Sequence, residues 1–143
     1  MAAKNGSYVV DASCLIKWIG LEMEEKEQAE KLRAAYAKKE VAITVPALTF
    51  WEIGNMLGRK FDPKTASSIF NHFQSYGFRQ ALLTLEMASL CHWIMKKYPG
   101  TSFYDASYHA LAIQHESIFI TSDKKYYEKT KGLGSILLLK DYK

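Results

Sequence analysis

Four acidic residues stand in apolar surroundings where an ordinary surface carboxylate is not expected. Asp11 ends the strand-like run in VVDAS, Glu52 lies in TFWEIGN, and Asp123 follows SIFIT. Asp105, in SFYDASYHALA, lies in a run so apolar and aromatic that it should be buried. Burying an ionised carboxylate is costly unless a partner or a cation compensates its charge. If the four acids lie together, oxygen-only ligands of this kind favour Mg²⁺ or Mn²⁺ over Zn²⁺.

Three of these acids have a simple structural explanation when each is taken alone. Asp11 could cap the turn after its strand, and Asp123 could be the N-cap of the helix that begins with KKYYEK. Asp105 could cap the helix ASYHALA, although Ser102 competes for that position. Taken jointly these explanations weaken, because four like charges at one place raise each other's pKa and need a neutralising cation.

The remaining acid and its neighbours on helices also have ordinary alternatives. Glu52 could form an ion pair with Lys17 or Arg59. Most of the other acids are expected on solvated helix faces or at helix ends, with residues 22–30 as a charged helix face and Asp62 as a helix cap. The candidate site therefore rests on the four acids in apolar context.

The elements that must position these acids alternate along the chain. Strands are expected over residues 7–13, 41–45, 80–85, 117–121 and 135–140, and helices over 22–40, 46–60, 64–76, 86–98, around Asp105 and from Asp123. Continuous apolar strands that alternate with helices predict a mainly parallel sheet covered on both faces, a three-layer α/β/α sandwich. We expect one domain over residues 1–143.

This arrangement predicts that the four acids meet. In an open α/β sheet, the carboxyl ends of the strands and the starts of the following helices share one edge, where ligands bind. Asp11 and Asp123 reach that edge from strand ends, and Glu52 and Asp105 reach it from the first turns of helices. A metal-ion site at this edge is the expected result.

The motifs VVDAS, VPALTFWEIGNML, SFYDASYHALAI and FITSDKKY, in this order, resemble the PIN-domain family, particularly VapC-type toxins of toxin–antitoxin modules. The resemblance runs from about Tyr8 to the last strand and implies a parallel α/β/α fold. It implies that the acids matching Asp11, Glu52, Asp105 and Asp123 bind Mg²⁺ or Mn²⁺ and catalyse RNA cleavage. The middle segment, residues 61–80, matches little beyond its helical pattern, so nothing is inferred from the family there.

Further residues are expected to support that chemistry. Ser13 and Asn55 match polar positions of the family, and Thr121 and Ser122 are further candidates to orient carboxylates or water. Basic side chains near the motifs would hold the RNA backbone, with solvated surface as the alternative for each: Lys17, Arg59, Lys60, Lys124 and Lys125. Aromatic candidates for base stacking are Tyr104, Tyr126 and Tyr127, with core packing favoured for Tyr104. The resemblance also implies a cognate VapB-like antitoxin and a homodimer.

The composition sets the outer limits. The 143 residues are 48% hydrophobic and carry a net charge of +4, which indicates a folded domain and only mildly favours a polyanionic partner. Cys14 and Cys91 lack metal spacing and are expected to be reduced core thiols; with no membrane span or signal peptide in the sequence, this predicts a cytoplasmic protein. Two alternatives to the nuclease are a Mg²⁺-binding phosphoacceptor receiver domain and a non-catalytic PIN-like binding module.

Overall fold

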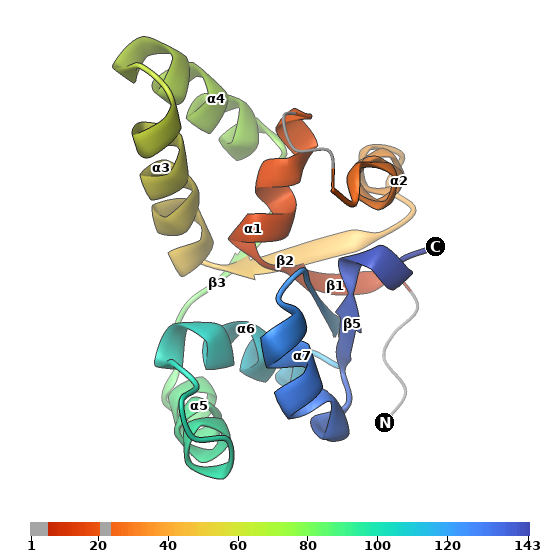
Figure 1. The fold of residues 1–143 in the computed structure, drawn as a ribbon, viewed down its shortest axis with the longest axis vertical. Coiled ribbons are helices and arrows are strands. Elements are labelled where there is room, and N and C mark those ends of the chain that lie inside the picture. The colour runs from red at the N-terminus through yellow and green to blue at the C-terminus, as the bar shows by residue number, and fades with distance from the viewer. Residues whose placement is uncertain (1–5, 21–23) are drawn as a thin grey trace.

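The computed structural model describes residues 6–20 and 24–143, and its centre is a five-stranded sheet (Figure 1). The strands are β1 (Ser7–Val10), β2 (Ala42–Pro46), β3 (Arg79–Ala81), β4 (Ile118–Thr121) and β5 (Ile136–Leu138). They lie in the order β3-β2-β1-β4-β5, and all four pairings are parallel. The expected parallel α/β fold is confirmed.

Helices cover both faces of this sheet. They are α1 (Ala12–Leu15), α2 (Lys26–Ala37), α3 (Leu48–Lys60), α4 (Pro63–Ser75), α5 (Leu85–Lys97), α6 (Phe103–Gln114) and α7 (Lys124–Thr130), with the 3-10 turns η1 (Ile16–Ile19), η2 (Lys131–Leu133) and η3 (Leu139–Asp141). In Figure 1, α1 to α4 lie above the sheet and α5 to α7 lie below it. The three layers of the predicted sandwich are present.

Each face of the sheet has its own apolar core. Val9 and Val10 point to opposite faces of β1, as alternation along a strand requires. Val10 packs in one buried cluster with Ile53 and Leu57 of α3, whereas Val9 packs in the other with Leu111 of α6. Because both faces of the sheet are covered, β1, β2, β4 and β5 are mainly apolar and do not alternate, whereas the edge strand β3 is the largely exposed segment RQA.

The sequence overestimated several element lengths. The first strand ends at Val10 because Asp11 caps α1, and the last ends at Leu138 before η3. The helix expected over 22–40 spans 26–37, and its predicted residues 22 and 23 lie outside the described residues. The third strand, expected over 80–85, is only 79–81, because Thr84 already caps α5.

The strand order defines where a ligand site can form. The chain leaves β1 toward β2 and β3 and returns on the other side of β1 through β4 and β5. The direction of winding therefore changes between the neighbours β1 and β4, and open parallel sheets bind ligands in the crevice outside the carboxyl ends of strands at such a point. Helices α1, α3 and α7 begin at this edge, each following a strand, and the antiparallel return of α6 places its first turn there too.

Candidate functional site

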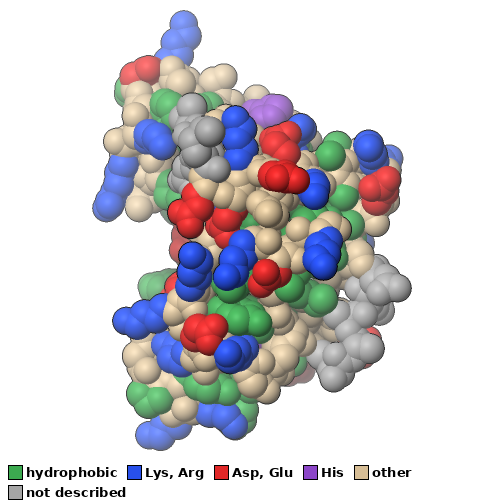
Figure 2. Space-filling view, turned by 45° about the vertical axis from the view of Figure 1, so that its right-hand side comes forward, with side chains coloured by type: hydrophobic (Ala, Val, Ile, Leu, Met, Phe, Trp, Pro, Cys, Tyr) green, Lys and Arg blue, Asp and Glu red, His purple; other side chains and the backbone are tan. Residues whose placement is uncertain are grey.

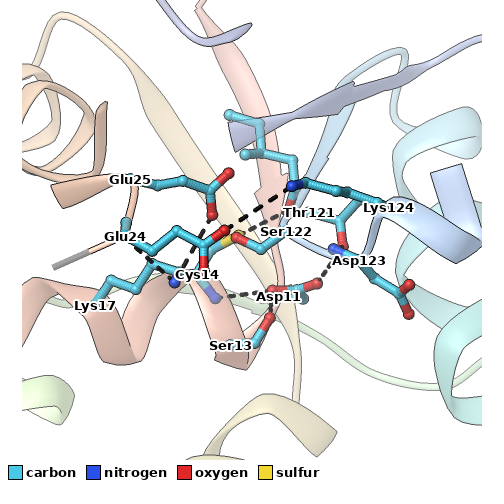
Figure 3. Close-up of polar contacts among 11 residues, drawn as sticks. Asp11, Ser13, Cys14, Lys17, Glu24, Glu25, Thr121, Ser122, Asp123 and Lys124 are labelled. Carbon is cyan, nitrogen blue, oxygen red and sulfur yellow. Dashed lines mark hydrogen bonds and ion pairs between the residues drawn. The ribbon is translucent and has the colours of Figure 1, made fainter. Parts of the chain in front are cut away.

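Asp11 lies at the carboxyl end of β1, and its carboxylate is held by three donors (Figure 3). The Ser13 hydroxyl donates to Oδ1 at 2.7 Å, and the Cys14 backbone N–H donates to the same oxygen at 2.9 Å. The Thr121 hydroxyl, from the end of β4, donates to Oδ2 at 2.7 Å. Asp11 is thus the N-cap of α1, as expected if it caps the turn after its strand. The Thr121 hydrogen bond also connects Asp11, at the end of β1, to the end of β4.

Thr121 links Asp11 to the second acid at a strand end. Its buried Oγ1 accepts a hydrogen bond from the Asp123 backbone N–H at 3.1 Å while donating to Asp11. The Asp123 side chain accepts from the Tyr126 N–H at 2.9 Å and is the N-cap of α7. The capping alternative for Asp123 is therefore also correct, and one carboxylate oxygen remains outside that bond.

Glu52 projects from α3 and is held by the helix on the other face of the sheet. The Tyr108 hydroxyl of α6 donates a short hydrogen bond to Oε1 of Glu52, and the Thr49 hydroxyl donates to Tyr108 Oη at 2.9 Å. Burial raises the pKa of Glu52; the Tyr108 hydrogen bond lowers it, and the charges of Asp11 and Asp105 raise it further. Among the ion pairs between described residues, neither of those suggested for Glu52, with Lys17 or with Arg59, is found.

Asp105 differs from expectation, because its side chain is exposed and not buried. Asp105 lies in the first turn of α6. The N-cap of this helix is Ser102, whose hydroxyl oxygen accepts a hydrogen bond from the Asp105 backbone N–H, so the Asp105 carboxylate is not the cap. Partial desolvation raises the pKa of Asp105, and so do the charges of Asp123 and Asp11; Ser102 and Lys129 lower it. The run is buried from Ala106 onward, but Tyr104 and Asp105 in the first turn of α6 are exposed.

The four carboxylates are therefore electrostatic neighbours. Glu52 is affected by Asp11 and Asp105, and Asp105 is affected by Asp11 and Asp123. Within residues 6–20 and 24–143, however, no three Asp, Glu, His or Cys side chains lie close enough to enclose one ion. The donor set, all carboxylate oxygens with hydroxyl support, fits a hard divalent cation in chemistry, although the side chains do not form a closed cage.

The other predicted supporting residues lie at different distances from this centre. Ser122 contacts the Cys14 thiol, with Oγ and Sγ 3.3 Å apart, and does not touch a carboxylate. Asn55 is exposed on α3 beside Trp51 and Phe70, and its side chain makes no hydrogen bond to another described residue. Ser13 and Thr121 contact an acid directly, whereas Ser122 and Asn55 do not.

Among the basic candidates, Lys17 is the one whose placement differs most from expectation. It is only 7% exposed, and its Nζ lies 3.7 Å from Oε1 of Glu25. Glu25, expected on a solvated helix face, is equally buried in this pair because it precedes α2 in a left-handed conformation. A buried, paired ammonium does not fit the predicted phosphate contact, so this assignment of Lys17 is corrected.

The exposed basic residues divide into two groups. Lys124 and Lys125 lie on the first turn of α7 next to Asp123, and Lys124 Nζ is 3.9 Å from Glu24. Arg59 and Lys60 lie at the far end of α3, about 10–12 Å along the helix axis from Glu52. Figure 2 shows acidic and basic side chains interleaved across the middle of the molecule.

The aromatic candidates also change places. Tyr104, expected in the core, is 61% exposed and immediately precedes Asp105. Tyr126 is instead buried, with its hydroxyl 2.9 Å from Nδ1 of His109. Tyr127, the third candidate, is partly exposed, so Tyr104 is the most accessible of the three.

Sequence reasoning missed three groups near the acids. Tyr108 and Thr49 were overlooked, although each stands three residues from an acid and so on a neighbouring part of its helix face. Cys14 is confirmed as a free, buried cysteine, but it also lies directly against the Asp11 turn, where burial and then the charge of Asp11 raise the pKa of its thiol. Lys129 of α7 is near enough to lower the pKa of Asp105, and no motif marked it.

Comparison with known families gives this arrangement its context. The family model for the PIN domain matches residues 8–132. The chain belongs to the PIN domain family. PIN domains are generally nucleases and generally use divalent metal ions. Membership in this family decides against the receiver-domain alternative.

Solved structures share the PIN fold at low sequence identity. A toxin–antitoxin complex from Klebsiella pneumoniae matches with a TM-score of 0.68 and 14% identity over 92% of this chain and 97% of that one. VapBC2 from Rickettsia felis, bound to a promoter DNA fragment, matches with a TM-score of 0.66 and 12% identity over 92% of this chain and 96% of that one. A protein from Pyrobaculum aerophilum matches with a TM-score of 0.65 and 24% identity over 94% of this chain and 88% of that one. No curated protein sequence matches this PIN domain significantly.

Proposed function

We propose that this PIN domain is an Mg²⁺- or Mn²⁺-dependent endoribonuclease that acts as the toxin of a VapBC-type toxin–antitoxin pair. The observation that carries the enzymatic part is the electrostatic coupling of Asp11, Glu52, Asp105 and Asp123 at the switch point between β1 and β4. These acids come from four separate parts of the chain, and repulsion between them has no structural benefit. A site for a divalent cation explains why they are brought together.

In this proposal the four carboxylates hold the cation. A bound divalent ion lowers the pKa of water and stabilises the departing oxygen during phosphodiester hydrolysis. Ser13 and Thr121 fix the two oxygens of Asp11 from opposite sides, so that this carboxylate keeps one orientation. Oriented ligands of this kind raise metal affinity, because less freedom is lost on binding.

The exposed cations and aromatic rings beside the acids suit a single-stranded RNA substrate. Lys124 and Lys125 would contact phosphates next to Asp123, and Arg59 and Lys60 would contact the backbone further along α3. Tyr104 offers an exposed ring one residue before Asp105, where an unstacked base could pack.

The toxin role is supported by the kind of proteins that share the fold. Two of the similar structures are a toxin–antitoxin complex and VapBC2 with promoter DNA. We propose that this chain likewise binds an antitoxin, which would block the acidic edge or hold the toxin inactive. The promoter DNA of the Rickettsia felis complex does not by itself imply DNA binding by this chain.

A homodimer is proposed from an apolar surface next to the acids. Leu82 and Leu83 of the β3–α5 connection are 80% and 61% exposed, Leu85 at the start of α5 is 84% exposed, and Trp51 on α3 is 80% exposed. An apolar cavity of about 260 Å³ opens beside Leu82, Leu83 and Tyr104. Exposed apolar patches mark interaction sites in soluble proteins, and Leu82 and Leu83 lie in one such patch with Tyr104.

The decisive experiment is cleavage of a defined RNA by the purified protein with Mn²⁺ or Mg²⁺. We expect Asp11→Asn and Asp105→Asn to lower the cleavage rate by more than about 100-fold, beyond what residues that only support metal ligands usually contribute. Asp62→Asn is the matched control, because Asp62 is also a helix N-cap but lies on α4. It should cleave at the wild-type rate.

Inert wild-type protein with both metals, or fully active Asp11→Asn and Asp105→Asn variants, would contradict the nuclease. The first result favours the non-catalytic binding module. The dimer is tested separately by light scattering on wild type and a Leu83→Asp, Leu85→Lys variant. A monomeric wild type would reject the dimer without affecting the nuclease.

A further inference from the structure

We propose that Tyr108, itself held by Thr49, is a positioning residue that sets the orientation of the Glu52 carboxylate. This inference rests on the proposed function, in which Glu52 is one of the metal-binding acids. Tyr108 and Thr49 lie within the acid-bearing motifs, each three residues from an acid, and both side chains are buried.

The chain of hydrogen bonds has only one consistent direction. An ionised Glu52 carboxylate can accept but cannot donate, so the Tyr108 hydroxyl must donate to it. The single proton of Tyr108 is then used, and its oxygen is left to accept the Thr49 proton at 2.9 Å. Thr49 therefore selects the Tyr108 orientation that serves Glu52.

The tyrosine is held by packing as well as by hydrogen bonds. Its side chain is 2% exposed and Thr49 is fully buried. The ring stacks on Phe119 of β4, with ring centroids 5.6 Å apart and planes 11° apart. Tyr108 thus connects a rigid strand to a glutamate on a different helix, and fixing Oε1 leaves Oε2 directed away from this bond.

This support is specific to Glu52. Asp11 receives its donors from its own turn and from β4, whereas Tyr108 and Thr49 form the hydrogen-bonded support found for Glu52 among the described residues. A glutamate has one more rotatable bond than an aspartate, so it has more orientations to lose when a cation binds. Removing the tyrosine hydroxyl should therefore weaken the metal site through Glu52 alone.

The experiment measures Mn²⁺ affinity by calorimetry on the full chain without RNA. Tyr108→Phe should weaken Mn²⁺ binding about 10-fold or more, within the range that supporting partners of metal ligands contribute. In a Glu52→Ala background the same substitution should have no further effect. Thr49→Val should give a smaller loss, and Thr49→Ser, which keeps the hydroxyl, should restore affinity.

Tyr36→Phe is the matched control. This substitution also removes a hydrogen bond donated by a tyrosine hydroxyl, to the Tyr76 carbonyl at 2.9 Å. Tyr36 lies on α2, and its hydroxyl is not bonded to any of the four acids. Its Mn²⁺ affinity should equal that of wild type. Thermal melts of every variant establish that each one folds.

The outcomes separate the two proposals. If Asp11→Asn abolishes Mn²⁺ binding while Tyr108→Phe binds like wild type, the positioning role is overturned and the metal site stands. An equal loss from Tyr108→Phe in both backgrounds also overturns it, because the residue is then only structural. If wild type does not bind Mn²⁺, or Asp11→Asn binds it normally, both proposals fail. Should Tyr108→Phe not fold, wild-type affinity in Thr49→Val overturns the positioning role.

Discussion

The two acids at strand ends and the two acids on helices are held in different ways. Asp11 and Asp123, the strand-end acids, are both helix N-caps and are joined through Thr121. Glu52 and Asp105, the helix acids, are not helix N-caps, and the pKa of each is raised by desolvation and by the charges of neighbouring acids. Capping hydrogen bonds stabilise the positions of Asp11 and Asp123. Glu52 and Asp105 are placed among like charges, and this repulsion lowers the stability of the metal-free protein.

This difference separates two contributions to one site. A carboxylate that caps a helix satisfies backbone N–H groups and so stabilises the protein whether or not a cation is present. A carboxylate placed among like charges without such bonds stabilises nothing until a cation binds. Substitutions of the strand-end acids and their partners should therefore lower stability, whereas removing charge from the helix acids should raise it.

Thr121→Val should show the largest effect on stability. The substitution preserves volume at a side chain that is 1% exposed, but it removes the donor to Asp11 and the acceptor for the Asp123 N–H. Leaving such groups without a partner costs about 1–3 kcal/mol. For a chain of this size, we expect thermal melts to show a loss of about 3–10 °C.

Ser13→Ala is the control for Thr121→Val, because both substitutions remove a hydroxyl donor to the Asp11 carboxylate. Ser13 donates to the same carboxylate, but it is exposed, and the Cys14 N–H remains on the oxygen that loses the hydroxyl. The loss should stay below about 1 kcal/mol. Equal losses for Ser13→Ala and Thr121→Val would mean that the link between β1 and β4 adds nothing.

The sequence predicted the frame of this site well. Apolar strands that alternate with helices define a parallel sheet, and its edge then collects Asp11 and Asp123 from strand ends and Asp105 from the first turn of α6. Glu52, expected in a first turn, instead lies one turn into α3. These inferences depend on the order of elements, which the apolar pattern encodes directly.

The contacts between elements were not predictable in the same way. Whether Lys17 pairs with Glu25 or faces solvent depends on how the chain enters α2, which no local pattern encodes. The Tyr108 bond to Glu52 joins residues 56 positions apart and requires the packing of two helices on opposite faces of the sheet. The apolar pattern predicts a uniformly buried run and so does not indicate that Tyr104 and Asp105, in the first turn of α6, are exposed.

Asp105→Asn should stabilise the metal-free protein, opposite to Thr121→Val. The substitution removes one charge from a crowded group while its shape is kept, and water screens part of the repulsion at this exposed side chain. We expect a gain of about 0.5–1 kcal/mol at neutral pH in thermal melts with a chelator present. Adding Mn²⁺ should then raise the melting temperature of the wild type more than that of the variant.

The stability gain from Asp105→Asn should depend on pH, and the raised pKa of Asp105 determines the direction. The pKa of Asp105 in the folded protein is raised above the unfolded value of about 3.9, so the folded state holds this proton more tightly. The associated stability is present below that unfolded value and is lost as pH rises through the folded pKa. The advantage of Asp105→Asn should therefore be small near pH 4 and grow toward neutral pH. An advantage that is constant with pH would show that charge is not its cause.

Asp123→Asn should give the smallest change in stability, and its comparison with Asp123→Ala separates the capping role of Asp123 from its role at the metal site. Asparagine caps helices about as well as aspartate, so Asp123→Asn should keep the bond to the Tyr126 N–H and change the free energy of unfolding by less than about 0.5 kcal/mol. Asp123→Ala removes the cap and should cost about 1 kcal/mol. If the carboxylate also serves the metal site, both variants lose RNA cleavage although only alanine loses stability. Full cleavage by Asp123→Asn would leave Asp123 as a helix cap and reduce the metal-binding set to Asp11, Glu52 and Asp105.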